Sequence, residues 1–146
     1  MTEQVILLVE DSSSDEELTL RALKKHKIAN RVVVTRDGAE ALDYLFAQGA
    51  YSGRNMDEVP QVVLLDLNLP KIGGLEVLRR IRADDRTKLL PVVILTSSRE
   101  DRDLVSGYAS GANSYVVKPV DFTQFAEAVR QMGMYWLVLN QGAPNV

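Results

Sequence analysis

Short apolar runs alternate with longer amphipathic stretches along almost the whole chain. The runs are VILLV (5–9), VVV (32–34), VVLL (62–65), VVIL (92–95) and YVV (115–117). Most of them contain no polar residue, which is typical of parallel strands buried on both faces, because a half-exposed strand would alternate apolar and polar positions. The pattern therefore predicts five parallel strands.

The stretches between these runs carry helix signals. Ser13 and Ser14 each precede a glutamate by three residues, which is the spacing of a capping box, and the first helix is expected to continue to about Lys27. Asp37 is expected to cap a second helix. Further helices are marked by Leu75, Leu78 and Ile81, by Leu104 and Tyr108, and by a start at Asp121. Strands alternating with helices predict right-handed βαβ units, and hence an α/β fold of (βα)5 type with helices on both faces of the sheet.

The length of 146 residues suits one domain. We expect a single domain over residues 1–146, with a core at about 4–132 and a helical extension at about 133–141. The chain contains no cysteine, which excludes disulfides and thiolate metal sites and fits a cytoplasmic location. A net charge of −3 argues against nucleic-acid partners, and no apolar run approaches the roughly 18 residues of a membrane span.

Polar side chains follow four of the five predicted strands. Glu10 and Asp11 follow the first strand, Asp66 the third, Thr96 the fourth and Lys118 the fifth. Each has an ordinary explanation on its own, as a helix cap or a solvated side chain. Ligands, however, bind outside the carboxyl ends of parallel strands, where all of these residues are expected to meet. Together they predict a functional site.

The predicted site has a chemistry of its own. Three carboxylates at contact distance repel one another by roughly 4 kcal/mol per pair at an effective dielectric near 20, so they need a cation. Oxygen ligands without Cys or His select a hard ion, and Mg²⁺ fits best. Beside a metal, the Thr96 hydroxyl and the Lys118 ammonium, Asp66 is a plausible nucleophile toward a phosphoryl group.

Four segments taken together resemble a known family. EDSSSDE, LLDLNLPKIGGLEVL, ILTSS and YVVKPVD occur in the order of the motifs of the bacterial response-regulator receiver domain. The resemblance covers nearly the whole chain. It implies a flavodoxin-like, doubly wound sheet of order 2-1-3-4-5 and a phosphoacceptor of a two-component phosphorelay. Such a protein is not an enzyme in the usual sense, since it catalyses only its own phosphotransfer and autodephosphorylation.

The resemblance assigns roles to the acidic residues. Glu10 and Asp11 match the acidic pair that holds Mg²⁺, and Asp66 matches the phosphoacceptor, which is also a metal ligand. Asn68 matches the position whose backbone carbonyl binds the metal.

The resemblance also assigns the residues that sense the phosphoryl group. Thr96 matches the switch hydroxyl, Lys118 the phosphate-binding lysine, and Ser97 a small residue that keeps the phosphoryl group reachable. Tyr115 matches an aromatic rotamer switch, although without the resemblance a buried core side chain would be the simpler interpretation. Pro119 matches a cis-proline of the family.

Two local features depart from the common receiver pattern. Gly73 stands where many receivers carry an acid, while Gly74 is kept and is expected to be the flexible turn residue. The stretch 47–60 is longer than the roughly 2 to 6 residues usual between a helix and a strand. It resembles the insertion of small stand-alone receivers that work with phytochrome-type or hybrid sensor kinases, as does the terminal YWL.

The expected partners follow from the resemblance and from the C-terminal sequence. The resemblance implies a sensor histidine kinase and an output face formed by the fourth helix, fifth strand and fifth helix. The tail QMGMYWLVLN is apolar all round, which usually marks an interface. We therefore expect a homodimer through the fifth helix and its extension, with packing on the domain's own surface as the alternative. The interface residues are Met134, Tyr135, Leu137 and Val138.

Three other functions fit parts of the sequence. A haloacid-dehalogenase-like phosphatase also uses an Asp nucleophile with Mg²⁺, but it needs a second acid where this chain has Asn68. A flavin-binding flavodoxin would place phosphate beside Glu10 and Asp11, which would repel it. A receiver that works without phosphorylation remains an alternative.

Overall fold

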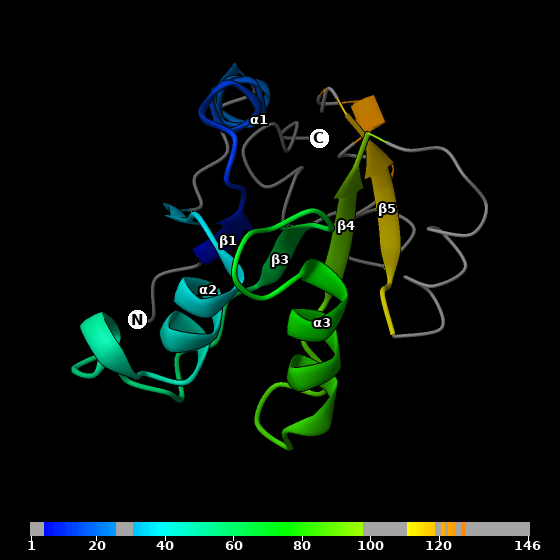
Figure 1. Cartoon of the computed structure of the whole chain (residues 1–146). Helices are drawn as coiled ribbons and strands as arrows, with labels where there is room; N and C mark the ends of the chain where they lie inside the picture. The colour runs from blue at the N-terminus through cyan, green and yellow to red at the C-terminus, as the bar shows by residue number, and fades with distance from the viewer. Residues whose placement is uncertain are drawn as a thin grey trace, which may run out of the picture.

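The computed structural model describes residues 5–25, 31–97, 111–118, 121, 123–124 and 127. Its centre is a five-stranded parallel sheet of order β2-β1-β3-β4-β5 (Figure 1). The strands are β1 (Val5–Val9), β2 (Arg31–Thr35), β3 (Val62–Asp66), β4 (Val92–Thr96) and β5 (Ser114–Val117). The five parallel strands and their order are as predicted, and the fold is the flavodoxin-like α/β arrangement.

The burial of the strands follows their place in the sheet. Every residue of β3 and β4 is buried, and β1 is buried except at its first residue. The edge strands β2 and β5 are only partly buried. Since β-branched and large aliphatic side chains fit a pleated surface covered on both sides, the Val- and Leu-rich runs fill the three central positions.

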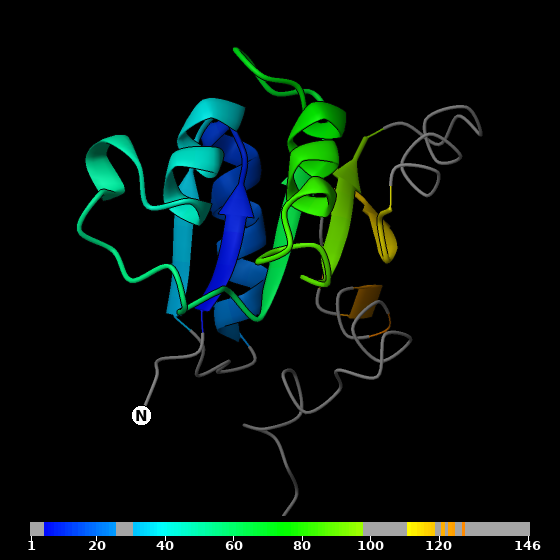
Figure 2. The ribbon, with the colours of Figure 1, turned by 90° about the horizontal axis from the view of Figure 1, so that it is seen from below.

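Helices lie on both faces of the sheet. Figure 2 shows α1 (Ser13–Lys25) on one face, and α2 (Gly38–Leu45) and α3 (Gly74–Ala83) on the other. Leu23 of α1 belongs to the cluster that includes Ile6 and Leu8, and Leu20 packs against it, whereas α2 and α3 pack on the cluster that includes Leu7. The two clusters are the two hydrophobic layers of a doubly wound fold. Among the described residues, no helix is long and apolar enough to cross a bilayer.

The start of α1 differs from the prediction. The Asp15 backbone N–H donates to Ser12 Oγ at 3.2 Å, and the Glu16 N–H donates to the Ser12 carbonyl at 2.9 Å. Ser12 therefore caps the helix, and the prediction that Ser13 or Ser14 caps it is wrong. The run of three serines offers three equivalent hydroxyls, and the length of the loop after β1 decides which of them meets the free N–H groups.

The starts of two other helices are as predicted. Asp37 caps α2, accepting from the Glu40 backbone N–H at 2.7 Å. Asp121 accepts from the Gln124 N–H at 2.8 Å, in the manner of a helix cap. The predicted fourth helix, with Leu104 and Tyr108, lies outside the described residues, as does the extension at 133–141.

The helix marked by Leu75, Leu78 and Ile81 is present as α3, and two of these three residues are buried. Gly74, Val77, Leu78 and Ile81 are buried, whereas Leu75 is exposed at 36% of its surface. The helix starts with Gly74 against the loop after β3, which turns residues 77 and 78 onto the sheet. Leu75 then falls outside the buried stripe.

The long stretch after α2 is structured. It contains a 3-10 helix, Gly49–Tyr51. The Arg54 guanidinium lies 4.2 Å from the Tyr44 ring centroid and donates to the backbone carbonyls of Tyr44 at 2.7 Å and Leu45 at 3.2 Å. These carbonyls belong to the last turn of α2, where intrahelical donors run out. Arg54 thus closes the helix and fixes the stretch to it.

Candidate phosphoacceptor site

The predicted site residues gather at the carboxyl edge of the sheet. Asp66 and Thr96 are the last residues of β3 and β4, Glu10 and Asp11 follow β1, and Lys118 follows β5. The parallel register pairs Asp66 with Leu95 and Thr96 with Val117, so neighbouring strands end at nearly the same level. Residues up to 108 positions apart in the chain, from 10 to 118, therefore meet at one edge.

The carboxylates of Glu10, Asp11 and Asp66 form a compact cluster. Each offers an oxygen, and these oxygens lie within 4.8 Å of one another. Glu10 is fully buried and Asp66 is 4% exposed, whereas Asp11 faces solvent. The prediction that these acids meet is confirmed.

Lys118 neutralises part of this charge. Its ammonium lies 2.7 Å from Glu10 Oε1, 3.2 Å from Asp66 Oδ2 and 3.1 Å from Asp15 Oδ2. Asp15, in the first turn of α1, was not among the predicted site residues. Its position in EDSSSDE looks like that of any acid at a helix N-terminus, so the sequence carried no sign that it reaches a lysine 103 residues away.

The buried charges shift the pKa values of the cluster. Burial raises the pKa of Glu10 to about 7; the Lys118 ammonium opposes this shift and the Asp66 carboxylate adds to it. Burial alone would lower the pKa of Lys118, but its contacts with Glu10, Asp15 and Asp66 outweigh burial and raise it. Lys118 is therefore a permanent cation, and the charge of Glu10 is held weakly near neutral pH.

The donor set fits a hard divalent cation. Glu10 Oε1 is buried and, apart from its ion pair with Lys118, accepts no hydrogen bond. The cluster holds three carboxylates against one ammonium, and oxygen-only ligands of this kind suit Mg²⁺ or Mn²⁺. A cation beside Glu10 and Asp66 would offset the excess negative charge of the cluster.

The loop after β3 holds Asp66 in place. The Asn68 backbone N–H donates to Asp66 Oδ1 at 3.2 Å, and the Gly74 N–H donates to the Leu67 carbonyl at 3.1 Å. Lys71 adopts a left-handed conformation with φ of 67°. Gly74 is buried at the start of α3, so its predicted role as a flexible turn residue is wrong. Its role is close packing, since a Cβ there would overlap the Asp66 carbonyl oxygen.

The two predicted switch residues differ in exposure. Thr96 is 1% exposed and ends β4, the neighbour of the strand that ends in Asp66. Tyr115 is 38% exposed on the edge strand β5. The alternative that Tyr115 is a buried core side chain is therefore wrong, because only one strand neighbours β5. Pro119 and the predicted interface residues Met134, Tyr135, Leu137 and Val138 lie outside the described residues.

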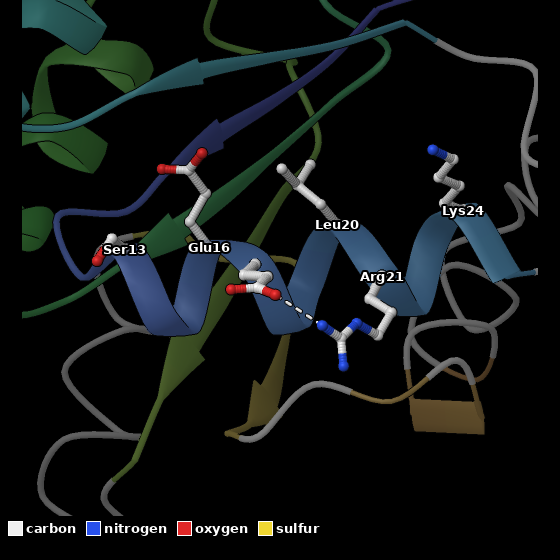
Figure 3. A pocket seen from close by; sticks show the side chains of 6 residues that line it. Ser13, Glu16, Leu20, Arg21 and Lys24 are labelled. Atoms are coloured by element: carbon white, nitrogen blue, oxygen red, sulfur yellow. Dashed lines mark hydrogen bonds and ion pairs between the residues drawn. The ribbon is translucent and has the colours of Figure 1, made fainter.

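A separate pocket runs along α1, with a volume of about 460 Å³ (Figure 3). It is lined by Ser13, Glu16, Glu17, Leu20, Arg21 and Lys24. Arg21 donates to Glu17, one turn earlier in the same helix, at 2.6 Å. None of the strand-end residues lines this pocket, so it is not part of the carboxylate site.

The family model described as the response regulator receiver domain matches residues 6–130. The chain belongs to this family. This receiver is 41% identical over 137 residues to the probable methanogenesis regulatory protein FilR2 of Methanothrix harundinacea (strain 6Ac), covering 94% of this chain and 86% of the relative. It is 37% identical to the response regulator Rcp1 of Synechocystis sp. (strain ATCC 27184 / PCC 6803 / Kazusa), covering 92% of this chain and 89% of Rcp1.

The structure of this receiver is also similar to solved structures of response regulators. The bacteriophytochrome response regulator AtBRR has a TM-score of 0.85 and 54% identity, with 93% of this chain and 96% of that chain covered. The Mn(2+)-bound form of Rcp1 has a TM-score of 0.75 and 37% identity, with 92% and 94% covered. The resemblance inferred from the four sequence motifs is confirmed, including the similarity to phytochrome-associated receivers.

Proposed function

We propose that this receiver is the phosphoacceptor of a phosphorelay, and that it takes a phosphoryl group from a sensor histidine kinase onto Asp66. The observation that carries the proposal is the contact of one buried aspartate with both a lysine and an acidic cluster. Asp66 lies 3.2 Å from Lys118 and shares its surroundings with Glu10 and Asp11. We take residues 1–146 as one receiver domain, working in the reducing cytoplasm, without a nucleic-acid or membrane partner.

Glu10, Asp11 and Asp66, with the Asn68 backbone carbonyl, would hold Mg²⁺ in this receiver. The Mn(2+)-bound structure of Rcp1 supports a divalent ion in a relative, and the cluster of three carboxylates beside a single ammonium supports one here. When bound, the ion supplies charge neutralisation at the phosphoryl oxygens.

The transfer uses the Asp66 carboxylate as nucleophile. One carboxylate oxygen forms a bond to phosphorus while the phosphorus–nitrogen bond of the kinase phosphohistidine breaks, and the imidazole nitrogen keeps the electron pair. Lys118 offsets negative charge on the phosphoryl oxygens, and the Thr96 hydroxyl donates to one of them. The backbone bond from Asn68 to Asp66 Oδ1 orients the carboxylate before the reaction. Hydrolysis of the acyl phosphate by water, catalysed by the same residues, would return the receiver to its starting state.

Phosphorylation would reach partners through Thr96 and Tyr115. A phosphoryl group gives the Thr96 hydroxyl a new acceptor, which stabilises a conformation with the hydroxyl drawn toward it. Tyr115, now 38% exposed, would turn inward into the space released. This movement would change the face formed by the fourth helix, fifth strand and fifth helix, to which partners bind.

The relatives support the proposed kinase partner, and the C-terminal sequence supports the proposed homodimer. AtBRR and RtBRR, which are 54% and 50% identical to this chain, are bacteriophytochrome response regulators, and this supports a phytochrome-type kinase as the phosphoryl donor. We also propose a homodimer through the fifth helix and the apolar extension with Met134, Tyr135, Leu137 and Val138. Light scattering at micromolar concentration, with and without phosphorylation, tests the dimer; a monomer in both states would refute it.

The phosphoacceptor is tested by incubation with acetyl phosphate and Mg²⁺, followed by intact-mass analysis. We expect the native chain to gain one phosphoryl group and the Asp66→Asn variant to gain none. Asp57→Asn is the matched control, because Asp57 is exposed in the stretch after α2, away from the cluster. A phosphorylated Asp66→Asn variant, or a native chain that gains no phosphoryl group, would contradict the proposal.

A further inference from the structure

Lys118 has one more carboxylate partner than the proposed reaction uses. Its ammonium contacts Glu10 at 2.7 Å and Asp66 at 3.2 Å, and it donates a hydrogen bond to Asp15 Oδ2 at 3.1 Å. The side chain of Lys118 is 11% exposed. An ammonium has three N–H donors, and in the unmodified protein that of Lys118 is surrounded by three carboxylates.

The three partners are not equivalent. The side chains of Glu10 and Asp66 are 0% and 5% exposed, whereas that of Asp15 is 35% exposed. A buried carboxylate that loses its cation pays a large desolvation cost, while an exposed one is hydrated at once. Asp15 is therefore the partner that Lys118 can release most easily.

Helix capping does not explain the contact. The Asp15 backbone N–H is bonded to Ser12 Oγ at 3.2 Å, and this bond depends on the backbone and not on the carboxylate. An acid in the first turn is favourable for a helix by itself, and Glu16 also supplies one. Glu16, however, pairs with Arg36 at 3.1 Å, on a different element. Of the two acids, Asp15 is the one aligned with the lysine of the site.

We propose that Asp15 is a positioning residue that competes with the incoming phosphoryl group for Lys118, and so restrains phosphorylation of Asp66. The inference rests on the proposed phosphoacceptor function. When phosphoryl oxygens arrive beside Asp66, Lys118 must donate a hydrogen bond to them. To do so it gives up its hydrogen bond to Asp15. Asp15 also adds a negative charge that the phosphoryl group must approach. Both effects favour the unmodified state.

Removing the charge of Asp15 should therefore favour phosphoryl-like ligands. For a partly exposed, charge-assisted contact we expect Asp15→Asn to tighten the dissociation constant of beryllofluoride, measured with Mg²⁺ present, by about three- to tenfold. The rate constant for phosphorylation by acetyl phosphate should rise by a similar factor. Asp15→Glu keeps the charge and should stay closer to the native protein.

The matched control is Glu16→Gln, which removes the same charge from the same turn of α1 without a contact to Lys118. We expect it to change the beryllofluoride constant and the phosphorylation rate less than twofold, because screening weakens charges that make no direct contact. Unfolding in urea for each variant separates a change in helix stability from a change at the site. A purely structural role of Asp15 would alter the unfolding curve and leave the beryllofluoride constant unchanged.

The outcomes separate this inference from the function on which it rests. Tighter beryllofluoride binding and faster phosphorylation in Asp15→Asn alone support it. An unchanged or slower Asp15→Asn variant, or a Glu16→Gln variant with the same gain, overturns it while leaving Asp66 as phosphoacceptor. A native chain that neither binds beryllofluoride nor accepts a phosphoryl group overturns the proposed function, and this inference with it.

Discussion

The packing of Gly74 makes a sharp test of how the site is built. Gly74 opens α3, and a Cβ at this position would overlap the Asp66 carbonyl oxygen and lie 2.7 Å from Leu67 Cα. Both neighbours are backbone atoms, so no side chain can rotate to make room. The Gly74→Ala substitution must move either α3 or the end of β3, where the proposed phosphoacceptor lies.

The magnitude can be worked out from two opposing effects. Overpacking against a rigid neighbour costs up to about 3 kcal/mol, and alanine returns about 1 kcal/mol of helix propensity, which leaves a loss of about 2 kcal/mol in the free energy of unfolding. For a chain of this size the melting temperature should fall by about 4 to 8 °C. A displaced Asp66 should also accept a phosphoryl group from acetyl phosphate about ten- to a hundredfold more slowly.

The neighbouring glycine supplies the control. A Cβ at Gly73 would meet nothing within 4 Å, and its φ of −68° suits any residue. Gly73→Ala should change the free energy of unfolding by less than about 1 kcal/mol and leave phosphorylation unchanged. Urea unfolding and the acetyl phosphate reaction are measured on both variants. A Gly74→Ala variant as stable and as reactive as Gly73→Ala would refute the argument that the backbone contact holds Asp66 in place.

Three further predictions concern other contacts. Asp37→Ala removes the cap that accepts from the Glu40 N–H at 2.7 Å, and should cost about 1 kcal/mol at pH 7 by urea unfolding. That backbone bond lowers the pKa of Asp37 in the folded protein. The stabilisation by the Asp37 carboxylate is therefore fully present above the unfolded pKa of about 3.9, and it should fade as pH falls through the lower folded pKa. If Asp37→Ala costs as much stability at pH 2 as at pH 7, this reasoning is contradicted. Arg54→Ala removes the guanidinium bound to the Tyr44 carbonyl and should cost about 1 to 3 kcal/mol, with faster amide exchange at 49–60; unchanged exchange there would count against it. Because the pKa of Glu10 is raised to about 7, Mg²⁺ affinity measured by calorimetry should weaken below pH 7 by up to about tenfold per unit, and equal affinity at pH 6 and 8 would contradict this.

Much of the fold could be predicted because it depends on local patterns. The uninterrupted apolar runs predicted all five strands, and Asp37 predicted the start of α2. The predictions failed where the same local signal fits several positions. Three consecutive serines made the cap of α1 ambiguous, and only the path of the chain after β1 selected Ser12. Tyr115 was open to interpretation as a core residue, because a short apolar run does not show how far each of its side chains is covered by the rest of the fold.

The sequence by itself determined which residues end the strands, since the change from apolar to polar marks each end and parallel strands share one carboxyl edge. The sequence therefore predicted that Glu10, Asp66 and Lys118 meet at one site. The tertiary structure alone decided the contacts between side chains and backbone across that edge, such as Lys118 with Asp15 and Gly74 with the Asp66 carbonyl. These contacts depend on how helices are placed over the sheet to within a few ångströms. That placement results from packing of the whole core and leaves no local pattern in the chain.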